Sequence, residues 1–459
     1  MTKKSRFEGS TRDSLMARVR TMKQFDKSRN AEKAVQIARY AALTDFSTLP
    51  GFEDVRLQRA FGEKLGLENP YFKLYEGIAS SRIQADGREL INFSCYDYLN
   101  LNGHPEIVAA AKAAIDEYGI SCSASRVVAG ERIVHRRFEM SLAKHYGSED
   151  ALLFVSGYGT NVCVVGQMVG SKDLVIYDSA SHNSIVAGSV MSGATRRSFL
   201  HNDLNSLEEQ LDRLRDRYER VLIVVEGHYS MDGDYPDLPR LLEIKDKFGC
   251  WLMIDEAHSL GVLGKTGRGL AEIYGVDPSR VDIWMGTLSK TLVGCGGYIA
   301  GSANMVDFLR SLGNAFVYSV GLPPVIAASS EKALTIVHRE PDRVNKLQSN
   351  AAFFAKVASE KGLNLGSSQQ TAICPLIVGD SVPAVLLSQQ LFKRGINVKP
   401  VLYPGVPAGT SRLRFFLNAA HTFDDIEIAL NCVVDELQNV YRMTKDFERK
   451  RSGATTREF

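Results

Sequence analysis

Gly286-Thr287-Leu288-Ser289-Lys290 stands just before the glycine-rich run Gly294-Cys295-Gly296-Gly297. Asp255 lies thirty-five residues upstream of the lysine, at the end of the apolar run Trp251-Leu252-Met253-Ile254. A lysine held among small residues can form a Schiff base with an aldehyde. An aspartate at the carboxyl end of a strand can keep a pyridine nitrogen protonated. The pair therefore predicts pyridoxal phosphate as the cofactor.

Short β-rich runs alternate with helical patterns between about Glu106 and Ala315. The runs are Ala151–Val155, Leu174–Tyr177, Val221–Val225, Trp251–Ile254 and Ile283–Met285. Such alternation predicts an α/β fold with a mainly parallel sheet covered by helices. A helix is expected after Pro323-Pro324, and a strand-rich stretch follows over 364–414, with an amphipathic helix over 424–443. That C-terminal part is predicted to be a smaller α+β domain.

The pattern divides the chain into four parts. We predict an N-terminal extension together with the entry segment of the small domain over 1–90, a large cofactor-binding domain over 91–325, a small domain over 326–445 and a disordered tail over 446–459. Asp86-Gly87-Arg88 is typical of a hairpin turn between two short strands, and the segment before Asn69-Pro70 is expected to be loop-rich.

The extension begins with a basic, polar segment from Ser10 to about Tyr40. Leu15, Val19 and Met22 recur at steps of three and four residues, which predicts a helix. One interpretation is an arm that packs on a neighbour or on the enzyme's own surface. The alternative is a docking element for a carrier protein.

Composition excludes several classes of protein. The chain has 459 residues and a formal net charge of +2, so neither nucleic acid nor a membrane is indicated as a partner. No apolar run approaches the roughly 20 residues of a membrane-spanning helix. The charged residues Met1 to Arg6 lack a following apolar region, so no secretory signal is expected. Seven scattered cysteines indicate reduced thiols and a cytoplasmic enzyme.

Two motifs imitate a nucleotide-hydrolysing enzyme. Asp255-Glu256-Ala257-His258 spells a helicase signature, and Gly264-Lys265-Thr266 resembles the end of a P-loop. A P-loop needs a glycine at position 259, where the chain has serine, and it should precede the acidic strand. Nucleotide hydrolysis is therefore rejected. No metal site is predicted.

Polar residues follow four of the β-rich runs, at positions 156, 182, 226–230 and 255–258. Ligands of open parallel sheets bind at the carboxyl ends of the strands, so these residues are expected to converge. Ser156-Gly157-Tyr158-Gly159 opens a helical run whose free N–H groups suit a phosphate. The His182 imidazole could stack on the pyridine ring, although a histidine with only a packing role is the alternative.

The chain resembles the α-oxoamine synthases, a branch of the fold-type I pyridoxal-phosphate enzymes, from about Asn92 to Met443. The motifs that carry the resemblance are Asn92-Phe93-Ser94-Cys95-Tyr96-Asp97-Tyr98-Leu99, Glu226 to Asp234, Asp255 to Gly261, Gly286 to Lys290, Arg412-Leu413-Arg414 and Ala419-Ala420-His421-Thr422. The resemblance implies a large domain with a mainly parallel seven-stranded sheet. It also implies a homodimer with the active site at the interface.

The resemblance implies a role for each matching residue. Lys290 is implied to form the Schiff base and to transfer protons, Asp255 to pair with the pyridinium, and His182 to stack on it. His258 is implied to reach the ring hydroxyl and assist acylation. Phosphate contacts are implied for Gly157, Tyr158 and Thr287, a further cofactor contact for Ser230, and a contact to the partner subunit's phosphate for Ser319. Arg414 is implied to hold the amino-acid carboxylate, with Arg412 as the alternative because it shares the same strand face.

Several positions differ from the usual residues of the family, and these differences bear on which acyl donor the enzyme uses. Tyr96 stands where the amino-oxononanoate synthases have an asparagine. A tyrosine at this position resembles the serine palmitoyltransferases, and Tyr96 is expected to contact the substrate. Ser121 to Arg126 replaces a glycine-rich acyl site, which argues against a short acyl-CoA. The segment Asn69-Pro70-Tyr71-Phe72 is similar to assembly-line members, which can take an acyl group from an acyl carrier protein.

The resemblance implies a decarboxylative Claisen condensation of a small L-amino acid with an acyl thioester, which gives an α-amino ketone. Serine, alanine and glycine, and acyl carrier protein and CoA, all stay open at this point. An aminotransferase, a Cβ–Cβ lyase or a sphingolipid-type serine palmitoyltransferase are alternatives. A non-catalytic subunit is disfavoured because Lys290, Asp255 and His182 are all present.

Overall fold

The computed structural model describes residues 5–64 and 66–454, and the chain divides into two compact units. The first unit ends at Asn69 and contains the long helix α1 (Ser5–Leu43), a short 3-10 turn (Phe46–Thr48) and α2 (Phe52–Lys64). The predicted N-terminal helix is thus present. The expected loop-rich segment contains α2, which Glu53 and Asp54 favour in its first turn and Lys64 in its last.

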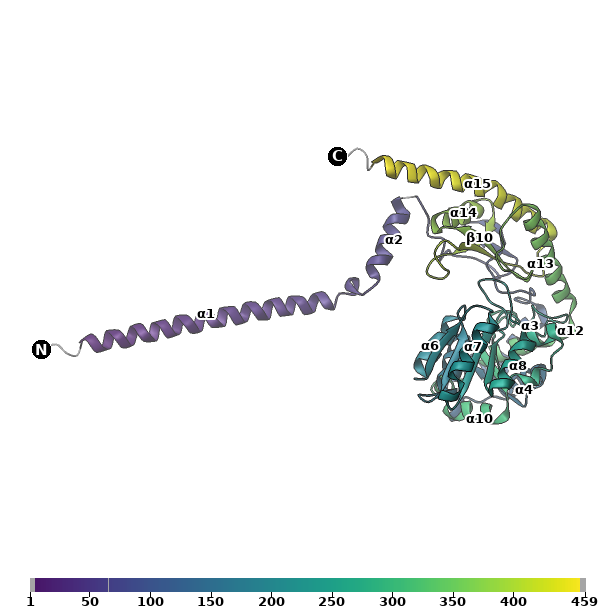
Figure 1. Ribbon diagram of the computed structural model, residues 1–459, viewed down its shortest axis with the longest axis horizontal. Helices are drawn as coiled ribbons and strands as arrows, with labels where there is room; N and C mark the ends of the chain where they lie inside the picture. Colours follow the sequence, from purple (N-terminus) through teal and green to yellow (C-terminus); the bar gives the residue numbers. More distant parts are fainter. Residues whose placement is uncertain (1–4, 65, 455–459) are drawn as a thin grey trace. The chain divides into compact units, whose positions relative to one another are not determined.

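The second unit begins at Pro70 and contains a large and a small domain (Figure 1). The large domain is built on a seven-stranded sheet in the order β3-β9-β8-β7-β6-β4-β5. The strands are β3 (Asp150–Phe154), β4 (Leu174–Asp178), β5 (Thr195–Phe199), β6 (Val221–Glu226), β7 (Trp251–Asp255), β8 (Ile283–Thr287) and β9 (Gly297–Gly301). Only β9 runs against its neighbours in this sheet, so the predicted mainly parallel architecture is confirmed.

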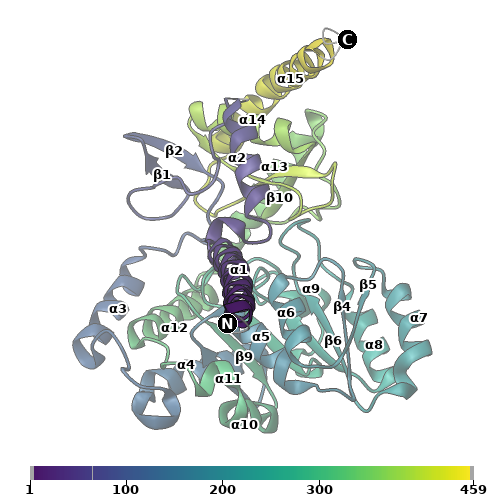
Figure 2. The ribbon, with the colours of Figure 1, turned by 90° about the vertical axis from the view of Figure 1, so that its left-hand side faces the viewer.

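Helices cover both faces of this sheet. They are α3 (Pro105–Tyr118), α4 (Ile133–Tyr146), α5 (Gly157–Met168), α6 (Asn183–Met191), α7 (Leu204–Leu214), α8 (Leu238–Phe248), α9 (Leu270–Tyr274), α10 (Ala303–Leu312), α11 (Asn314–Val317) and α12 (Pro324–Arg339). Alternate strand residues such as Val224 and Met253 pack with α5, α6 and α10 in one apolar core. On the other face, Tyr146 of α4 stacks on Trp284 of β8. Figure 2 shows α7 and α8 beside the β5 end of the sheet.

The small domain contains two three-stranded sheets and three helices. Its strands are β1 (Arg82–Ala85), β2 (Arg88–Asn92), β10 (Ile373–Gly379), β11 (Ile396–Asn397), β12 (Lys399–Val401) and β13 (Ser411–Phe416). Helices α13 (Asp342–Glu360) and α14 (Ser381–Lys393) each pack on α15 (Phe423–Ala454) and on the β10-β13-β12 sheet (Figure 1). Strands β1 and β2 form the expected hairpin, and β2 pairs in parallel with β11.

The structure differs from the predicted domain boundaries at two places. Residues 70–90, where the entry segment of the small domain was expected, fold with the C-terminal small domain because β2 pairs with β11. Helix α12 packs on α3 and α4, which makes it part of the large domain although residues 326–339 were assigned to the small one. Helix α15 continues to Ala454, through most of the tail predicted as disordered, because lysine, glutamate and arginine there are good helix formers. Residues 455–459 lie outside the described residues.

No helix in residues 5–64 or 66–454 is both long enough and apolar enough to span a membrane.

Candidate active site

A cavity of about 370 Å³ opens at the carboxyl edge of the large sheet. Ten of the residues singled out from the sequence line it: Tyr96, Gly157, Tyr158, His182, Ser230, Asp255, His258, Thr287, Lys290 and Arg414. They come from the ends of β3, β4, β6, β7 and β8, from the loop after β2, and from β13 of the small domain. The parallel strands thus bring together residues far apart in the sequence, as the sheet geometry requires.

Lys290 lies half-buried in the loop that follows β8. Burial lowers the pKa of its amine to about 8, against the opposing effect of the Asp255 and Glu226 carboxylates. Its Nζ atom lies 5.8 Å from the centroid of the Tyr96 ring. A lysine with a pKa near 8 has an appreciable neutral fraction at neutral pH, which nucleophilic attack on an aldehyde requires.

Asp255 is held as a hydrogen-bond acceptor at the end of β7. Its Oδ2 accepts a hydrogen bond from Asn161 Nδ2 at 2.7 Å, and its Oδ1 accepts one from the Ala257 N–H at 2.9 Å. The side chain is 4% exposed. These two donors fix the orientation of the Asp255 carboxyl group, which suits an interaction with a protonated ring nitrogen.

A cup for a phosphate forms where α5 begins. Ser156 caps the helix by accepting the Gly159 N–H at 3.1 Å, which leaves the first N–H groups of α5 for a ligand. A Cβ atom at Gly157 would lie 2.7 Å from Thr287 Oγ1, so only glycine allows this approach. The Thr287 and Ser289 hydroxyls lie 2.8 Å apart beside the cup. These donors match a dianionic phosphate.

His182 caps α6 beside the cavity and is exposed in the single chain. Its Nδ1 lies 2.7 Å from Ser184 Oγ, and its backbone N–H donates to Glu226 Oε1 at 2.7 Å. The Tyr158 ring meets the His182 ring edge-on, with centroids 6.3 Å apart. The imidazole therefore has a fixed position and a free face toward the cavity lined by Lys290 and Asp255.

His258 is buried beneath the cavity with an aromatic shell. Its Nδ1 lies 2.7 Å from the Tyr98 hydroxyl, and its ring is parallel to Phe416 with centroids 6.3 Å apart. Burial, reinforced by the Lys290 charge, holds the pKa of His258 well below its usual value. The imidazole is therefore neutral at physiological pH.

The two candidate carboxylate-binding arginines differ in their partners. Arg412 Nη1 donates to Asp232 Oδ1 at 2.6 Å, so its charge is already neutralised. Arg414 lines the cavity, donates through Nη1 to the Ser230 carbonyl at 2.9 Å, and has a buried Nε without a partner in the described structure. Its guanidinium lies 4.6 Å from the Phe416 ring centroid. Arg414 is the arginine with donors left for a substrate carboxylate.

Ser319 is the predicted site residue that does not line this cavity. It follows α11 next to Tyr318, which is 84% exposed. Its expected contact would involve a second chain, so it stays a prediction.

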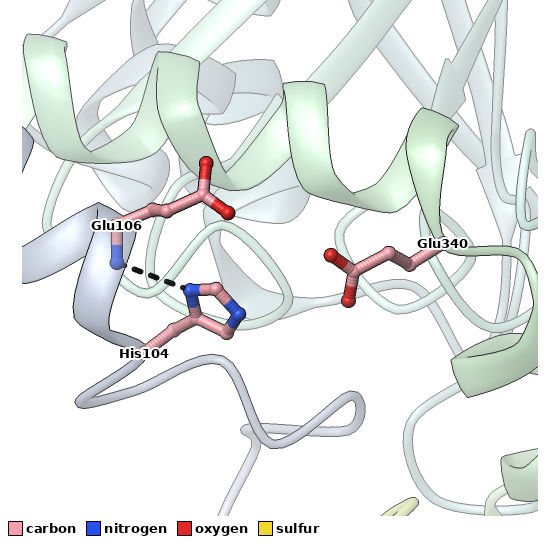
Figure 3. A group of neighbouring side chains, drawn as sticks. All are labelled: His104, Glu106 and Glu340. Carbon is pink, nitrogen blue, oxygen red and sulfur yellow. Dashed lines mark hydrogen bonds between the residues drawn. The ribbon is translucent and has the colours of Figure 1, made fainter.

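Among the described residues, one group has the spacing of metal ligands: His104, Glu106 and Glu340 (Figure 3). Glu106 and Glu340 both accept hydrogen bonds from Arg339, and Glu340 also pairs with Arg343 at 2.7 Å. The arginines already balance these carboxylates, so the cluster is an ion-pair network.

The residues present fit pyridoxal phosphate. The cup offers N–H and hydroxyl donors to the phosphate, Asp255 offers an oriented carboxylate to the ring nitrogen, and Lys290 offers an amine to the aldehyde. The glycine at 157 opens the space beside Thr287 that a Cβ would fill.

Comparison with known proteins identifies the family. Residues 88–433 match the model of the aminotransferase class I and II family. The 8-amino-7-oxononanoate synthase of Beijerinckia indica is 41% identical over 345 residues, 75% of this chain and 87% of that protein. The enzyme of the same name from Symbiobacterium thermophilum is 37% identical over 85% of this chain and 96% of its own. The chain belongs to the α-oxoamine synthases.

Solved structures of this family agree with the assignment. Serine palmitoyltransferase of Sphingomonas wittichii superposes with a TM-score of 0.82 at 30% identity, covering 86% of this chain and 99% of that one. A high-resolution serine palmitoyltransferase structure that contains pyridoxal phosphate is 28% identical, also with a TM-score of 0.82. This α-oxoamine synthase is therefore a pyridoxal-phosphate-dependent acyltransferase of fold type I.

Four residues of the site had no role in the sequence interpretation: Tyr98, Asn161, Ser184 and Glu226. Glu226 is buried beside Asp255, and burial raises the pKa of its carboxyl group to about 8. Tyr98 and Glu226 lie within the motifs that carry the family resemblance, and Asn161 lies two residues after the glycine-rich turn Ser156 to Gly159, so their position in the sequence was the signal. The partners that give them a role lie 44 to 160 residues away along the chain.

Proposed function

We propose that the enzyme condenses a small L-amino acid with an acyl thioester, with loss of carbon dioxide, to give an α-amino ketone and a free thiol. The observation that carries the proposal is the Arg414 guanidinium with an unpartnered buried Nε, in the same cavity as Lys290 and Asp255. An arginine with free N–H donors beside a reactive lysine can bind the carboxylate of an α-amino acid. Once the substrate carboxylate is held there, its position determines which bond to Cα faces the lysine.

Each site residue has one task in this proposal. Pyridoxal phosphate, when bound, supplies an aldehyde for the amino group and a ring that spreads the negative charge of Cα. Asp255 keeps the ring nitrogen protonated, because hydrogen bonds from Asn161 and the Ala257 N–H hold its carboxyl group in place for that contact. Lys290 moves the Cα proton, for which an amine pKa of about 8 is suitable. His182 confines the ring from one side.

We also propose that a second copy of the chain completes the site. Apolar side chains at the start of α5, within residues 126–130 and after α11, three segments linked by contacts of α11 with the other two, are exposed in the single chain, which a stable monomer surface would disfavour. They include Tyr158 at 50%, Val128 at 81%, Tyr318 at 84% and Val320 at 48% exposure. Ser319 lies between the last two, so a second copy seated here would bring Ser319 to its expected place near a phosphate.

For the acyl donor we propose an acidic carrier protein that holds the acyl group on a phosphopantetheine arm, recognised by α1. Residues 14–43 of this helix contain seven lysine and arginine residues and two acidic ones. Arg20, Lys23 and Lys27 follow steps of three and four residues, which places them on one face. Among residues 14–43, no cation is in an ion pair, and Leu15 and Met22 are over 60% exposed. Unpaired lysine and arginine side chains next to exposed apolar side chains on α1 suit the binding of an acidic protein partner.

The reaction is tested with the purified holoenzyme in a spectral titration with glycine, L-alanine and L-serine. The proposal expects one of them to change the visible absorbance of the cofactor, and an acyl thioester to produce an α-amino ketone detected by mass spectrometry. Release of the matching keto acid, with the cofactor converted to its amine form, would instead establish an aminotransferase. Preference for serine with a long acyl chain would place the enzyme with the serine palmitoyltransferases.

The carrier docking is tested by reversing charge on α1 in the full chain. Arg20→Glu, Lys23→Glu and Lys27→Glu together are expected to raise KM for acyl carrier protein about tenfold or more at low salt. KM for the same acyl group on CoA should not change. The control reverses three exposed cations of the catalytic unit, Lys112, Arg217 and Lys265. An equal effect of both triple variants, or the same effect on both donors, would reject α1 as the docking element.

A further inference from the structure

Tyr98 and His258 form a buried pair below the cavity. Tyr98 lies in the loop after β2 and is fully buried, and its hydroxyl oxygen is 2.7 Å from His258 Nδ1. Among the described residues, His258 is the hydrogen-bond partner of this hydroxyl. The shell is completed by Tyr96 and Phe416, whose rings contact the imidazole with centroid distances of 5.9 and 6.3 Å. The imidazole therefore cannot turn to exchange its two nitrogens without disturbing this packing.

The hydrogen on each group follows from this geometry. Burial raises the pKa of Tyr98 well above its usual value and lowers that of His258 well below, so both groups are neutral. A neutral tyrosine carries one hydrogen, and its acceptor here is His258 Nδ1. If Nδ1 held the imidazole hydrogen, the hydroxyl hydrogen would be buried without a partner, which is unfavourable. The imidazole hydrogen consequently sits on Nε2.

We propose that Tyr98 is a positioning residue that fixes His258 as the Nε2–H tautomer, so that His258 donates a hydrogen bond into the cavity and does not act as a base. The acceptor would be an oxygen that carries or gains negative charge, either the ring oxygen of the cofactor or the thioester carbonyl oxygen. A neutral imidazole that donates to such an oxygen stabilises developing charge without transferring its proton. Proton transfer is then left to Lys290. The proposal deepens the condensation proposed above.

Hydrogen bonds to the backbone of His258 also help to fix the position of its imidazole ring. The backbone carbonyl of His258 accepts from His228 Nδ1 at 3.0 Å, and His228 Nε2 contacts Thr371 Oγ1 at 2.7 Å. His228 is fully buried, and burial lowers its pKa to about 4, so it is neutral as well. Backbone and side chain of His258 are thus both held by neutral partners that do not compete for Nε2.

The direct test is the tautomer of His258 in the holoenzyme, read from ring nitrogen shifts in protein labelled with ¹⁵N-histidine. His258 resonances are assigned by their loss in His258→Gln. The proposal expects an unprotonated Nδ1 and a protonated Nε2 in the wild type, and a mixture of tautomers in Tyr98→Phe. A protonated Nδ1, or a doubly protonated ring at neutral pH, would overturn it. This readout needs no substrate, so it stays valid if the proposed reaction is wrong.

A double-mutant cycle tests the functional consequence. Tyr98→Phe should lower kcat about tenfold, the size expected for one buried hydrogen bond, and should have little further effect in the His258→Gln background. His258→Gln keeps an N–H donor and should retain more activity than His258→Ala. The control is Tyr146→Phe, an equally buried tyrosine whose hydroxyl lies 2.8 Å from that of Tyr298, outside the cavity lining. Equal loss from Tyr98→Phe in both backgrounds would overturn the positioning role.

Discussion

Glu226 and Asp255 end neighbouring parallel strands at the same register position, so two carboxyl groups lie side by side at the edge of the active site. Within the described residues, Asp255 has two hydrogen-bond donors, whereas Glu226 accepts one hydrogen bond, from the backbone N–H of His182. Burial and the neighbouring Asp255 raise the pKa of Glu226 to about 8. Glu226 is therefore protonated near neutral pH, and its carboxyl group differs from that of Asp255 in having a single hydrogen-bond donor among the described residues.

Glu226→Gln should therefore change the pH dependence of stability. The folded protein keeps the Glu226 proton up to about pH 8, whereas the unfolded chain releases it near pH 4.5, so this residue lowers stability as pH rises between those values. Glutamine mimics the protonated form. The melting temperature of the cofactor-free variant should exceed that of the wild type by at least about 2 °C at pH 8, with a smaller difference at pH 6. Parallel curves, like those expected for exposed Glu117→Gln, would contradict the assignment.

Asn161→Ala should weaken cofactor binding. The amide is the donor that holds Asp255 Oδ2 at 2.7 Å, and a lost hydrogen bond to a charged group costs about 1.5–3 kcal/mol. We expect the Kd for pyridoxal phosphate to rise about tenfold or more, measured by absorbance titration of cofactor-free protein. Asn161→Asp, which removes the donor and adds a like charge, should be worse than alanine. Unchanged affinity in both variants would rule out the supporting role.

Substitution of Arg414 should weaken binding of the amino acid, whereas substitution of Arg412 should lower the stability of the protein. Arg414→Ala is expected to raise KM for the amino acid about tenfold or more, because the carboxylate loses its charged donor. Arg412→Ala breaks the ion pair with Asp232 and should lower the melting temperature with little change in that KM. Amino-acid titrations and thermal melts of both variants check this. A larger KM effect from Arg412→Ala would reverse the assignment.

Lys290 should control the rate at which cofactor-free protein captures pyridoxal phosphate covalently. Only the neutral amine attacks an aldehyde, and the lowered pKa of about 8 places its titration within an accessible range. The capture rate, followed by stopped-flow absorbance, should rise roughly tenfold from pH 7 to pH 9 and then level off. A rate that continues to rise to pH 10 would indicate an unperturbed lysine. Lys290→Ala should show no covalent capture and no turnover.

Much of the fold follows from the sequence because buried parallel strands are apolar runs. All five predicted runs became strands of the large sheet. Strand β5 was missed because its residues Thr195 to Ser198 are polar and partly or fully exposed at the edge of the sheet. Strand β9 was missed because glycines at 297 and 301 bound a short run, and its antiparallel direction breaks the alternation with helices.

The convergence of residues at one cavity was predictable where a residue type follows a strand end, as for Lys290, Asp255 and His182, whereas their roles stay predictions. The structure was needed for residues whose proposed role depends on a contact with a residue that is distant in the sequence. Arg412 and Arg414 are two residues apart on one strand, and only their partners distinguish them. Tyr98 likewise acquires its place from His258, 160 residues away. Such contacts follow from tertiary packing, which local sequence patterns do not contain.

The most direct measurement of the central claim follows the carboxyl carbon of the amino acid. The holoenzyme is incubated with each [1-¹³C]-labelled amino acid, with and without an acyl thioester, and the label is traced by mass spectrometry. The proposed condensation predicts labelled carbon dioxide that depends on the thioester, in equal amount with an unlabelled α-amino ketone. Label retained in a keto acid, formed without any thioester, would contradict it.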